Sequence, residues 1–163
     1  MDAVIVPLTR GQFALVDADQ VEVLGLLWYA GDHGGRFYAQ RTERKNGRTK
    51  IVRMHRLIMN APDGVEVDHI NGNPLDNRKC NLRLASHAEN SANGPLDQKN
   101  KTGFKGVSFH KSRKKYRASI NIRGKHKHLG LFHSPAEAAK VYDEVAAREF
   151  GEFALTNKGM GLL

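Results

Sequence analysis

The chain of 163 residues has little of what exported or disulfide-stabilised proteins use. Its single cysteine, Cys80, can form no internal disulfide and offers no thiolate cluster for a structural zinc ion. No stretch approaches the ~18 apolar residues of a membrane-spanning helix, and the N-terminus lacks the basic-then-apolar pattern of a secretory signal. We therefore expect a cytoplasmic protein with no membrane partner, whose fold depends on packing.

Acidic residues are missing from one long segment. Residues 1–98 contain 12 Lys/Arg and 12 Asp/Glu, residues 98–136 contain 11 and none, and residues 137–163 contain 3 and 5. The net charge of +9 thus has its excess in the middle segment. Such a segment is typical of phosphate binding, because each neutralised phosphate releases counterions. A solvated basic surface, or a ribosome-like contact with RNA, is the plainer alternative.

The first sixty residues alternate short apolar runs with turn residues. Such runs predict short strands, and the polar pair Asn46-Gly47 between two of them predicts a hairpin turn. We expect strands at residues 4–6, 13–16, 36–40 and 50–53, and helices at about residues 19–28 and 54–59, the second stopped by Pro62.

The segment 65–93 has a different organisation. Residues 65–67 and 81–84 predict two strands, separated by the turn residues Asn71-Gly72-Asn73-Pro74. Ser86-His87-Ala88-Glu89 has the capping-box pattern that opens a helix, and Asn93-Gly94-Pro95 ends it. The expected order is strand, long loop, strand, helix.

The last sixty residues predict three strands and one helix. The strands are expected at residues 106–110, 116–122 and 126–132, and the helix begins at Ser134-Pro135 and ends at Gly151. Its apolar stripe is Ala138, Val141, Tyr142, Val145 and Ala146. We expect the helix to cover one sheet face, formed by Val107, Phe109, Tyr116, Ala118, Ile120 and Ile122. The other face then carries Ser108, His110, Arg117, Ser119, Asn121 and Arg123.

Four polar residues stand at the ends of the elements in the segment 65–93. Asp68 and His69 follow the first strand, Asn81 begins the second, and Asn90 lies in the first turn of the helix, so the four could converge. Phosphodiester hydrolysis needs a hard cation, which carboxylate and amide oxygens suit, and a base to activate water, which imidazole suits. Each residue alone is more typical of a turn or a surface, so the argument depends on their spacing.

At this point the sequence resembles the HNH nucleases, in particular the phage and intron homing endonucleases built on a strand–strand–helix metal finger. The resemblance lies in five motifs that follow the family's order and spacing. They are His55-Arg56-Leu57, Val67-Asp68-His69-Ile70-Asn71-Gly72, Asn77-Arg78, Asn81-Leu82-Arg83 and Glu89-Asn90-Ser91-Ala92-Asn93.

The resemblance implies a role for each site residue. Asp68 and Asn90 would hold a divalent metal, His69 would be the general base, and Asn81 would position the histidine or pin the loop. The third family letter is often histidine, and here it is Asn90. Asparagine is the weaker ligand for soft metals, so Mg²⁺, or else Mn²⁺, is expected rather than zinc. His55 either supports the finger from behind or packs in the core, and we favour packing.

Residues 103–157 resemble the plant ethylene-response-factor (Apetala-type) DNA-binding domain. The shared motifs are Gly103-Phe104-Lys105-Gly106-Val107, Tyr116-Arg117-Ala118-Ser119-Ile120, Leu129-Gly130-Leu131-Phe132, residues 136–142 and Asn157. That family contacts DNA through its three strands. The resemblance therefore implies DNA contacts at Lys105, Gly106, Ser108, His110, Ser119, Asn121, His126 and His128.

Two departures limit what the second resemblance implies. Ser108 and His110 stand where the family has arginines, and the turns between the strands differ in length from the family's, so groove binding is expected but no target sequence follows. Phosphate contacts need charge and reach but little geometry. On that ground we expect them at Lys111, Arg113, Lys114, Lys115, Lys125 and Lys127, beside Arg117 and Arg123 on the exposed strand face.

The expected architecture is α+β in two modules. Residues 1–93 would form the nuclease module, a small sheet with the ββα metal finger at about residues 65–93. Residues 94–102 would be a linker, residues 103–157 a three-stranded antiparallel sheet packed on one helix, and residues 158–163 a tail.

The leading hypothesis is a homing-type endonuclease that hydrolyses double-stranded DNA, nicking one strand, and is targeted by its basic C-terminal domain. It needs no small-molecule cofactor, and its oligomeric state cannot be read. One alternative is a DNA-binding regulator with an inactive HNH scaffold, although all expected site residues are present. An integrase-like or RNA-binding protein is another, disfavoured because the predicted strand face is poor in the aromatics that stack RNA bases. The basic hairpin around residues 36–48 either touches DNA or is solvated.

Overall fold

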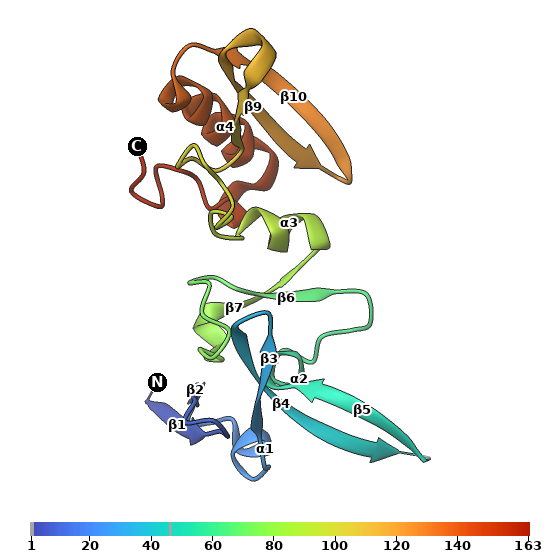
Figure 1. Cartoon of the computed structure of the whole chain (residues 1–163). Coiled ribbons are helices and arrows are strands. Elements are labelled where there is room, and N and C mark those ends of the chain that lie inside the picture. Colours follow the sequence, from blue (N-terminus) through green and yellow to red (C-terminus); the bar gives the residue numbers. More distant parts are fainter. Residues whose placement is uncertain (1, 46) are drawn as a thin grey trace. The chain divides into compact units, whose positions relative to one another are not determined.

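The computed structural model describes residues 2–45 and 47–163 and contains two compact units, Met1–Ser86 and His87–Leu163. Both are built from small antiparallel sheets and a few helices (Figure 1). The expected α+β class is therefore confirmed. Among the described residues, no helix is both long and apolar enough to cross a membrane.

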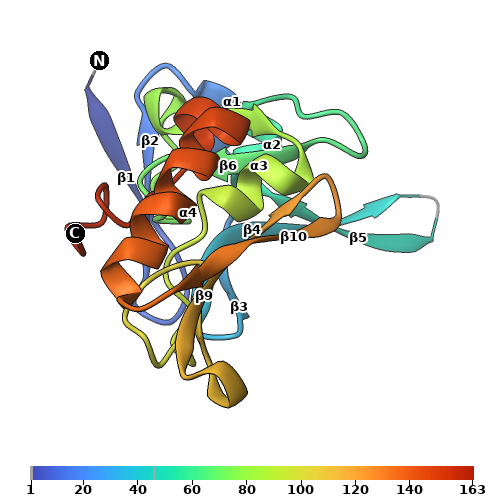
Figure 2. The same ribbon diagram turned by 90° about the horizontal axis from the view of Figure 1, so that it is seen from above.

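The first unit contains three small sheets. The strands are β1 (Ala3–Pro7) with β2 (Phe13–Asp17), then β3 (Tyr29–His33), β4 (Arg36–Lys45) and β5 (Arg48–Arg53), and finally β6 (Glu66–His69) with β7 (Leu82–Ala85). Short helical segments lie between them, namely α1 (Val21–Leu24), α2 (Met54–Ile58) and η1 (Lys79–Asn81). The β4–β5 hairpin extends away from the rest of this unit (Figure 2).

One apolar cluster holds the first unit together. It joins Val16 of β2 and Met54 of α2, both fully buried, to Val67 of β6 and Leu82 of β7. Burying such side chains contributes ~25 cal/mol per Å² of apolar surface removed from water. The strands β6 and β7 carry the candidate site. They are anchored in the core by Val67 and Leu82, which are the sequence neighbours of Asp68 and Asn81.

The helix predicted over residues 19–28 is wrong in length. α1 ends at Leu24, before Gly25, and the buried Trp28 donates from its indole Nε1 to the carbonyl oxygen of Val23 at 2.9 Å. The indole satisfies a carbonyl that would otherwise need a further helical turn. The following residues form β3, a strand that was not predicted.

The predicted hairpin in the first unit is longer than expected. β4 and β5 pair from Gln40–Arg53 out to Lys45–Arg48, and Gly47 has a φ of +74°. The other residue of the predicted turn, Asn46, lies outside the described residues.

The second unit contains a three-stranded antiparallel sheet in the order β10-β9-β8. Its elements are α3 (His87–Ala92), β8 (Val107–His110), η2 (Lys111–Arg113), β9 (Lys115–Ile122), β10 (Lys125–Phe132), α4 (Pro135–Phe150) and η3 (Gly151–Phe153). α4 lies along one face of the sheet (Figure 1). It begins at the predicted capping box, formed by Ser134 and Glu137, and ends at Gly151.

The covered face of this sheet matches the prediction except at Phe109. Val107, Ala118 and Ile120 are buried against α4, whereas Phe109 is 50% exposed. Phe109 lies on the edge strand β8, and α4 packs mainly against β9 and β10. The alternation of side chains predicted the correct face of the sheet for Phe109. This residue is exposed because α4 does not reach the end of the edge strand.

Asn157 locks the second unit across 52 residues of sequence. It is fully buried; its Oδ1 accepts from the Lys105 backbone N–H at 2.7 Å, and its Nδ2 donates to the Lys105 carbonyl and to Asp143 of α4. Gly106, next to Lys105, has a φ of +75°, and a Cβ there would meet the ring of Tyr142. The segment before β8 is thus fixed against α4.

Asn157→Ala should lower the free energy of unfolding of the second unit by about 3 kcal/mol, because buried partners left without hydrogen bonds cost ~1–3 kcal/mol each. Hydrogen exchange of α4 amides and urea unfolding followed by circular dichroism would measure it. Asn121→Ala, at an exposed position, is the control and should change stability by less than ~0.5 kcal/mol. If the α4 amides of Asn157→Ala were as well protected from hydrogen exchange as those of the wild type, Asn157 would not be the residue that holds the segment before β8 against α4.

Candidate active site

Asp68 and His69 close the short strand β6 and are both buried, with 3% and 7% of their surfaces exposed. Pairing with β7 sets Asp68 opposite Arg83 and His69 opposite Leu82. Because successive side chains of a strand point to opposite faces, the two neighbours face different surroundings. The carboxylate meets a cation, and the imidazole meets an aromatic and amide environment.

A buried ion pair orients the carboxylate of Asp68. Arg83 donates from Nε to Asp68 Oδ2 at 2.8 Å, and its Nη2 lies 2.8 Å from the same oxygen. A buried carboxylate without such a partner would be strongly destabilising. A carboxylate accepts bonds at both oxygens, so this pair is compatible with a metal-ligand role for Oδ1.

The loop between β6 and β7 is held by amide side chains. Asn81 donates from Nδ2 to Asn71 Oδ1 at 3.0 Å and to the Asp76 carbonyl at 2.8 Å, and its Oδ1 accepts from the Asn71 backbone N–H at 3.0 Å. These bonds tie the end of the loop to its start. The geometry of Asn81 is therefore that of a loop-pinning residue, the second of the two roles considered for it.

A second set of bonds centres on Asp76. Arg78 donates from Nε to Asp76 Oδ1 at 2.7 Å and from Nη2 to Oδ2 at 2.6 Å, and Asn71 donates to Oδ2 at 2.8 Å. The hydrogen bond from Arg78 is the main cause that lowers the pKa of Asp76, against the effect of burial. Asp76 therefore stays ionised and keeps the middle of the loop in one conformation.

Other strands of the first unit fix the loop from outside. Leu15 on β2 donates its backbone N–H to the Leu75 carbonyl at 2.8 Å and accepts from the Asn77 N–H at 2.7 Å. Asp17 accepts from the Lys79 N–H at 2.7 Å, and Arg36 of β4 donates to the Gly72 carbonyl at 2.9 Å. The N-terminal strands thus support the loop between β6 and β7.

His69 is held in a pocket of rings and amides. Its Nε2 lies 3.4 Å from Asn77 Oδ1, and its ring meets that of His55 edge to face at a centroid distance of 5.0 Å. Burial lowers the pKa of His69, while the bond to Asn77 and the carboxylates of Asp68 and Asp76 oppose this. The net direction is downward, so the imidazole is neutral near pH 7 and can accept a proton.

His55 forms the wall behind His69. It is buried, its Nδ1 has no hydrogen-bond partner among the described residues, and Tyr38 packs against it at a centroid distance of 5.9 Å. Burial is the largest cause that lowers its pKa to about 3, and His69 and nearby arginines add to it. Two roles were considered for His55, packing in the core and support of the finger. Because the buried His55 ring packs directly against His69, the same contact serves both.

Sequence reasoning missed three neighbours of the site. Asn77 is fully buried beside His69; it stands in a quoted motif but was given no role. Tyr38 contacts both His55 and His69, and His33 packs on Tyr38 at a centroid distance of 5.4 Å. Strand alternation could have placed Tyr38 on an inner face, but nothing local indicated its partners.

Asn90 lies on α3, in the second unit, so its convergence with Asp68 stays a prediction. Among the described residues, no group of three or more His, Cys, Asp or Glu side chains could hold a metal ion. The candidate donors are instead a carboxylate and an amide. Such a sparse oxygen set fits Mg²⁺ or Mn²⁺, which keep several waters and commonly use one or two protein ligands.

The predicted DNA contacts belong to the second unit, and the strand register groups most of them on the uncovered face. Opposite pairs there are Ser108–Arg117, His110–Lys115, Ser119–His128 and Asn121–His126. Lys111 and Arg113 on η2, Lys114 after it, and Arg123, Lys125 and Lys127 around the β9–β10 turn are exposed. Lys125 and Lys127 stand opposite Ile122 and Ile120, so their Cβ atoms are on the helix side of the sheet.

Lys105 serves the fold and leaves the set of expected DNA contacts. Its Nζ donates to the carbonyls of Ala92 and Gly94 at 2.6 Å and of Leu155 at 3.1 Å. An ammonium has three donors, and all three are used. Burial lowers the pKa of Lys105 to about 8. The bonds also attach the end of α3 to the second unit, whereas α3 was expected in the first module.

A family model and a curated relative place the chain in one family. Residues 53–92 match a family model described as HNH endonuclease. An uncharacterized HNH endonuclease of Acanthamoeba polyphaga mimivirus is 31% identical over 153 residues, which are 91% of this chain and 76% of that protein. Protein 3.8 of Escherichia phage T7 is 44% identical over 81 residues, 47% of this chain and 67% of that protein. No solved structure matches the chain.

Asn81→Ala should loosen the loop 70–81, because three hydrogen bonds to Asn71 and Asp76 are lost. We expect faster hydrogen exchange at the Asn71 amide and a loss of about 3 kcal/mol in unfolding free energy. Asn81→Asp keeps the acceptor for the Asn71 N–H, so its exchange rate and its unfolding free energy should lie between those of the wild type and Asn81→Ala. If the exchange rate at Asn71 stayed the same in Asn81→Ala, the pinning role would be wrong.

The first unit should lose stability as the pH falls from about 6.5 towards 3. In this range His55 binds a proton in the unfolded chain but stays neutral in the folded protein, so protonation favours the unfolded state. The free energy of unfolding is independent of His55 protonation above pH 6.5 and falls by about 1.4 kcal/mol per pH unit below it. Urea unfolding followed by the fluorescence of Trp28, at pH 7, 6 and 5, measures the slope. His55→Phe should flatten it, whereas His133→Gln, at an exposed site, should not. Equal slopes in wild type and His55→Phe would disprove the assignment.

Proposed function

Because the chain belongs to the HNH endonuclease family, we propose that it is a metal-dependent, homing-type endonuclease that hydrolyses phosphodiester bonds of double-stranded DNA. The observation that supports this most is the buried pair at the end of β6, an oriented carboxylate at Asp68 beside a neutral imidazole at His69. One such site in the chain suits the nicking of one strand. The viral and phage relatives suit a setting in the cytoplasm of an infected cell.

Each residue of the site has a distinct task in this proposal. Asp68 and Asn90 hold Mg²⁺ or Mn²⁺, which when bound would neutralise charge on the phosphate and on the leaving oxygen. His69 takes the proton from the attacking water. With Asn77 Oδ1 as acceptor, His69 Nε2 carries the proton and Nδ1 has the basic lone pair. Asn81 keeps the loop, and with it Asn77, in place.

Charge and alternation support the uncovered face of the β8–β10 sheet as the DNA-contact surface. Strand side chains can reach base edges in the major groove while lysines reach phosphates. We assign the base-edge role to Ser119, Asn121, His126 and His128, and the phosphate role to the cations of η2 and of the β9–β10 turn. The exposed cations at the tip of the β4–β5 hairpin, Lys45, Arg48 and Lys50, offer a second phosphate contact.

Purified protein should nick supercoiled plasmid DNA with Mg²⁺ or Mn²⁺ and not with EDTA. His69→Ala should reduce the rate ~10²–10⁴-fold, the usual contribution of a general base. Asp68→Asn should abolish metal-dependent cleavage while keeping an acceptor for Arg83. Both variants should still bind DNA in a gel-shift assay.

Two exposed positions give matched controls, Asp63→Asn and His133→Ala, which should cleave like the wild type. DNA binding by a folded wild type without cleavage of a substrate pool broad enough to include a specific target would sink the nuclease proposal. It would favour the alternative, a DNA-binding regulator on an inactive HNH scaffold.

A further inference from the structure

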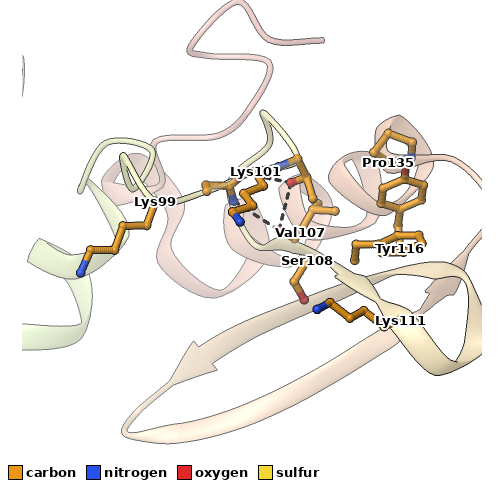
Figure 3. Close-up of a pocket in the computed structure, with 10 residues that line it drawn as sticks. Lys99, Lys101, Val107, Ser108, Lys111, Tyr116 and Pro135 are labelled. Atoms are coloured by element: carbon orange, nitrogen blue, oxygen red, sulfur yellow. Dashed lines mark hydrogen bonds between the residues drawn. The ribbon is translucent and has the colours of Figure 1, made fainter.

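A groove of about 630 Å³ lies on the second unit, beside the strand face assigned to the duplex, with which it shares Ser108 and Lys111 (Figure 3). It is lined by residues from three places, the segment 99–102, the β8–β9 hairpin and the start of α4 at Pro135. Figure 3 shows Lys99 at one end of the view and Tyr116 and Pro135 at the other, with Lys101 and Lys111 between them. The function described above uses none of its apolar lining.

The groove exposes an aromatic pair on the helix side of the sheet. Phe109 is 50% exposed and packs on Tyr116, with ring centroids 5.3 Å apart and planes tilted by 60°. Phe109 shares its face with Val107, which is buried, and not with Ser108 or His110. A large exposed ring is costly in water but is a good platform for a flat ligand.

The charged side chains that line the groove are all cationic. Lys99, Lys101 and Lys111 line the groove, and residues 98–136 contain no acidic residue. The two acids that flank this segment accept local backbone bonds: Asp97 Oδ1 accepts from the Lys99 N–H at 2.8 Å, and Glu137 accepts from the Ser134 N–H in the capping box of α4. The groove therefore suits a polyanion that also carries flat apolar groups.

The wall that bears two of the lysines is fixed before any ligand arrives. Asn100 donates from Nδ2 to the carbonyls of Phe104 and Val107 at 2.9 and 3.2 Å, and Thr102 donates from Oγ1 to the Val107 carbonyl at 3.0 Å. These bonds also occupy the β8 carbonyl that an added peptide strand would use first. Preorganisation of this kind lowers the entropic cost of binding.

We propose that this groove binds single-stranded DNA, with an unpaired base stacked on Phe109 and Tyr116 and the backbone phosphates near Lys99, Lys101 and Lys111. Bases of an intact duplex are already stacked on each other, so only an unpaired stretch can use the rings. Aromatic stacking contributes ~1–3 kcal/mol per base in such sites and tolerates any sequence. The choice of DNA over RNA rests on the proposed function, but the binding itself requires no cleavage.

Fluorescence anisotropy in EDTA, with a labelled oligothymidine and a blunt hairpin duplex, separates the groove from the nuclease. Phe109→Ala should weaken binding to the single strand by about 5–150-fold, the equivalent of ~1–3 kcal/mol, and leave duplex binding unchanged. Phe109→Trp should keep the affinity, whereas Phe109→Leu, which is apolar but not aromatic, should not. Equal losses on both ligands, or tighter binding of the matching RNA, would overturn the proposal whatever the plasmid assay gives.

A second variant avoids any doubt about folding, because it changes only lysines that line the groove surface. The double change Lys99→Ala with Lys101→Ala should reduce the salt dependence of single-strand binding, lowering the slope of log K against log salt by about 1.4, at ~0.7 per phosphate. Lys140→Ala, an exposed lysine on α4 outside the groove, is the control and should leave the slope unchanged. An unchanged slope in the double variant would overturn the proposal independently of Phe109.

Discussion

The candidate site depends on one constraint, which is that a polar loop must keep a single shape between two strands of four residues each. Strand pairing between β6 and β7 is too short to do this alone. The amide of Asn81 and the ion pair of Asp76 with Arg78 supply the missing bonds, and Leu15 and Asp17 hold the loop from a neighbouring sheet. The position of Asn77 against His69 follows from that fixed loop.

Local signals in the sequence were sufficient for much of the fold. The capping box, the apolar stripe and Gly151 predicted α4 to within a residue, and the strands of both units were predicted except β3. The errors occurred where an individual packing or hydrogen-bond contact decided the outcome. The indole of Trp28 completes a helix end that propensity would have extended, and Phe109 stays exposed because α4 does not reach the end of the edge strand β8. Such contacts leave no repeating pattern in the sequence from which they could be predicted.

The site was predictable in its residues but not in its surroundings. Spacing and family resemblance selected Asp68, His69 and Asn81, and the structure brings these three into one strand pair and its loop. The partner of Asp68 is Arg83, which stood in a motif without a role, and the ring environment of His69 comes from β4 and α2. Burial lowers the pKa of His69, and burial depends on packing between elements far apart in sequence.

The clamp at Asn157 has a consequence for the order in which the second unit is made. The backbone of Lys105 emerges from the ribosome 52 residues before the side chain that holds it. Until then the sheet lacks its link to α4 through Asp143, and contacts of long sequence separation form late. The basic sheet can therefore be complete only after synthesis has passed residue 157, when the first unit is already free to fold. The first unit is thus exposed to the cell before the second unit has taken shape.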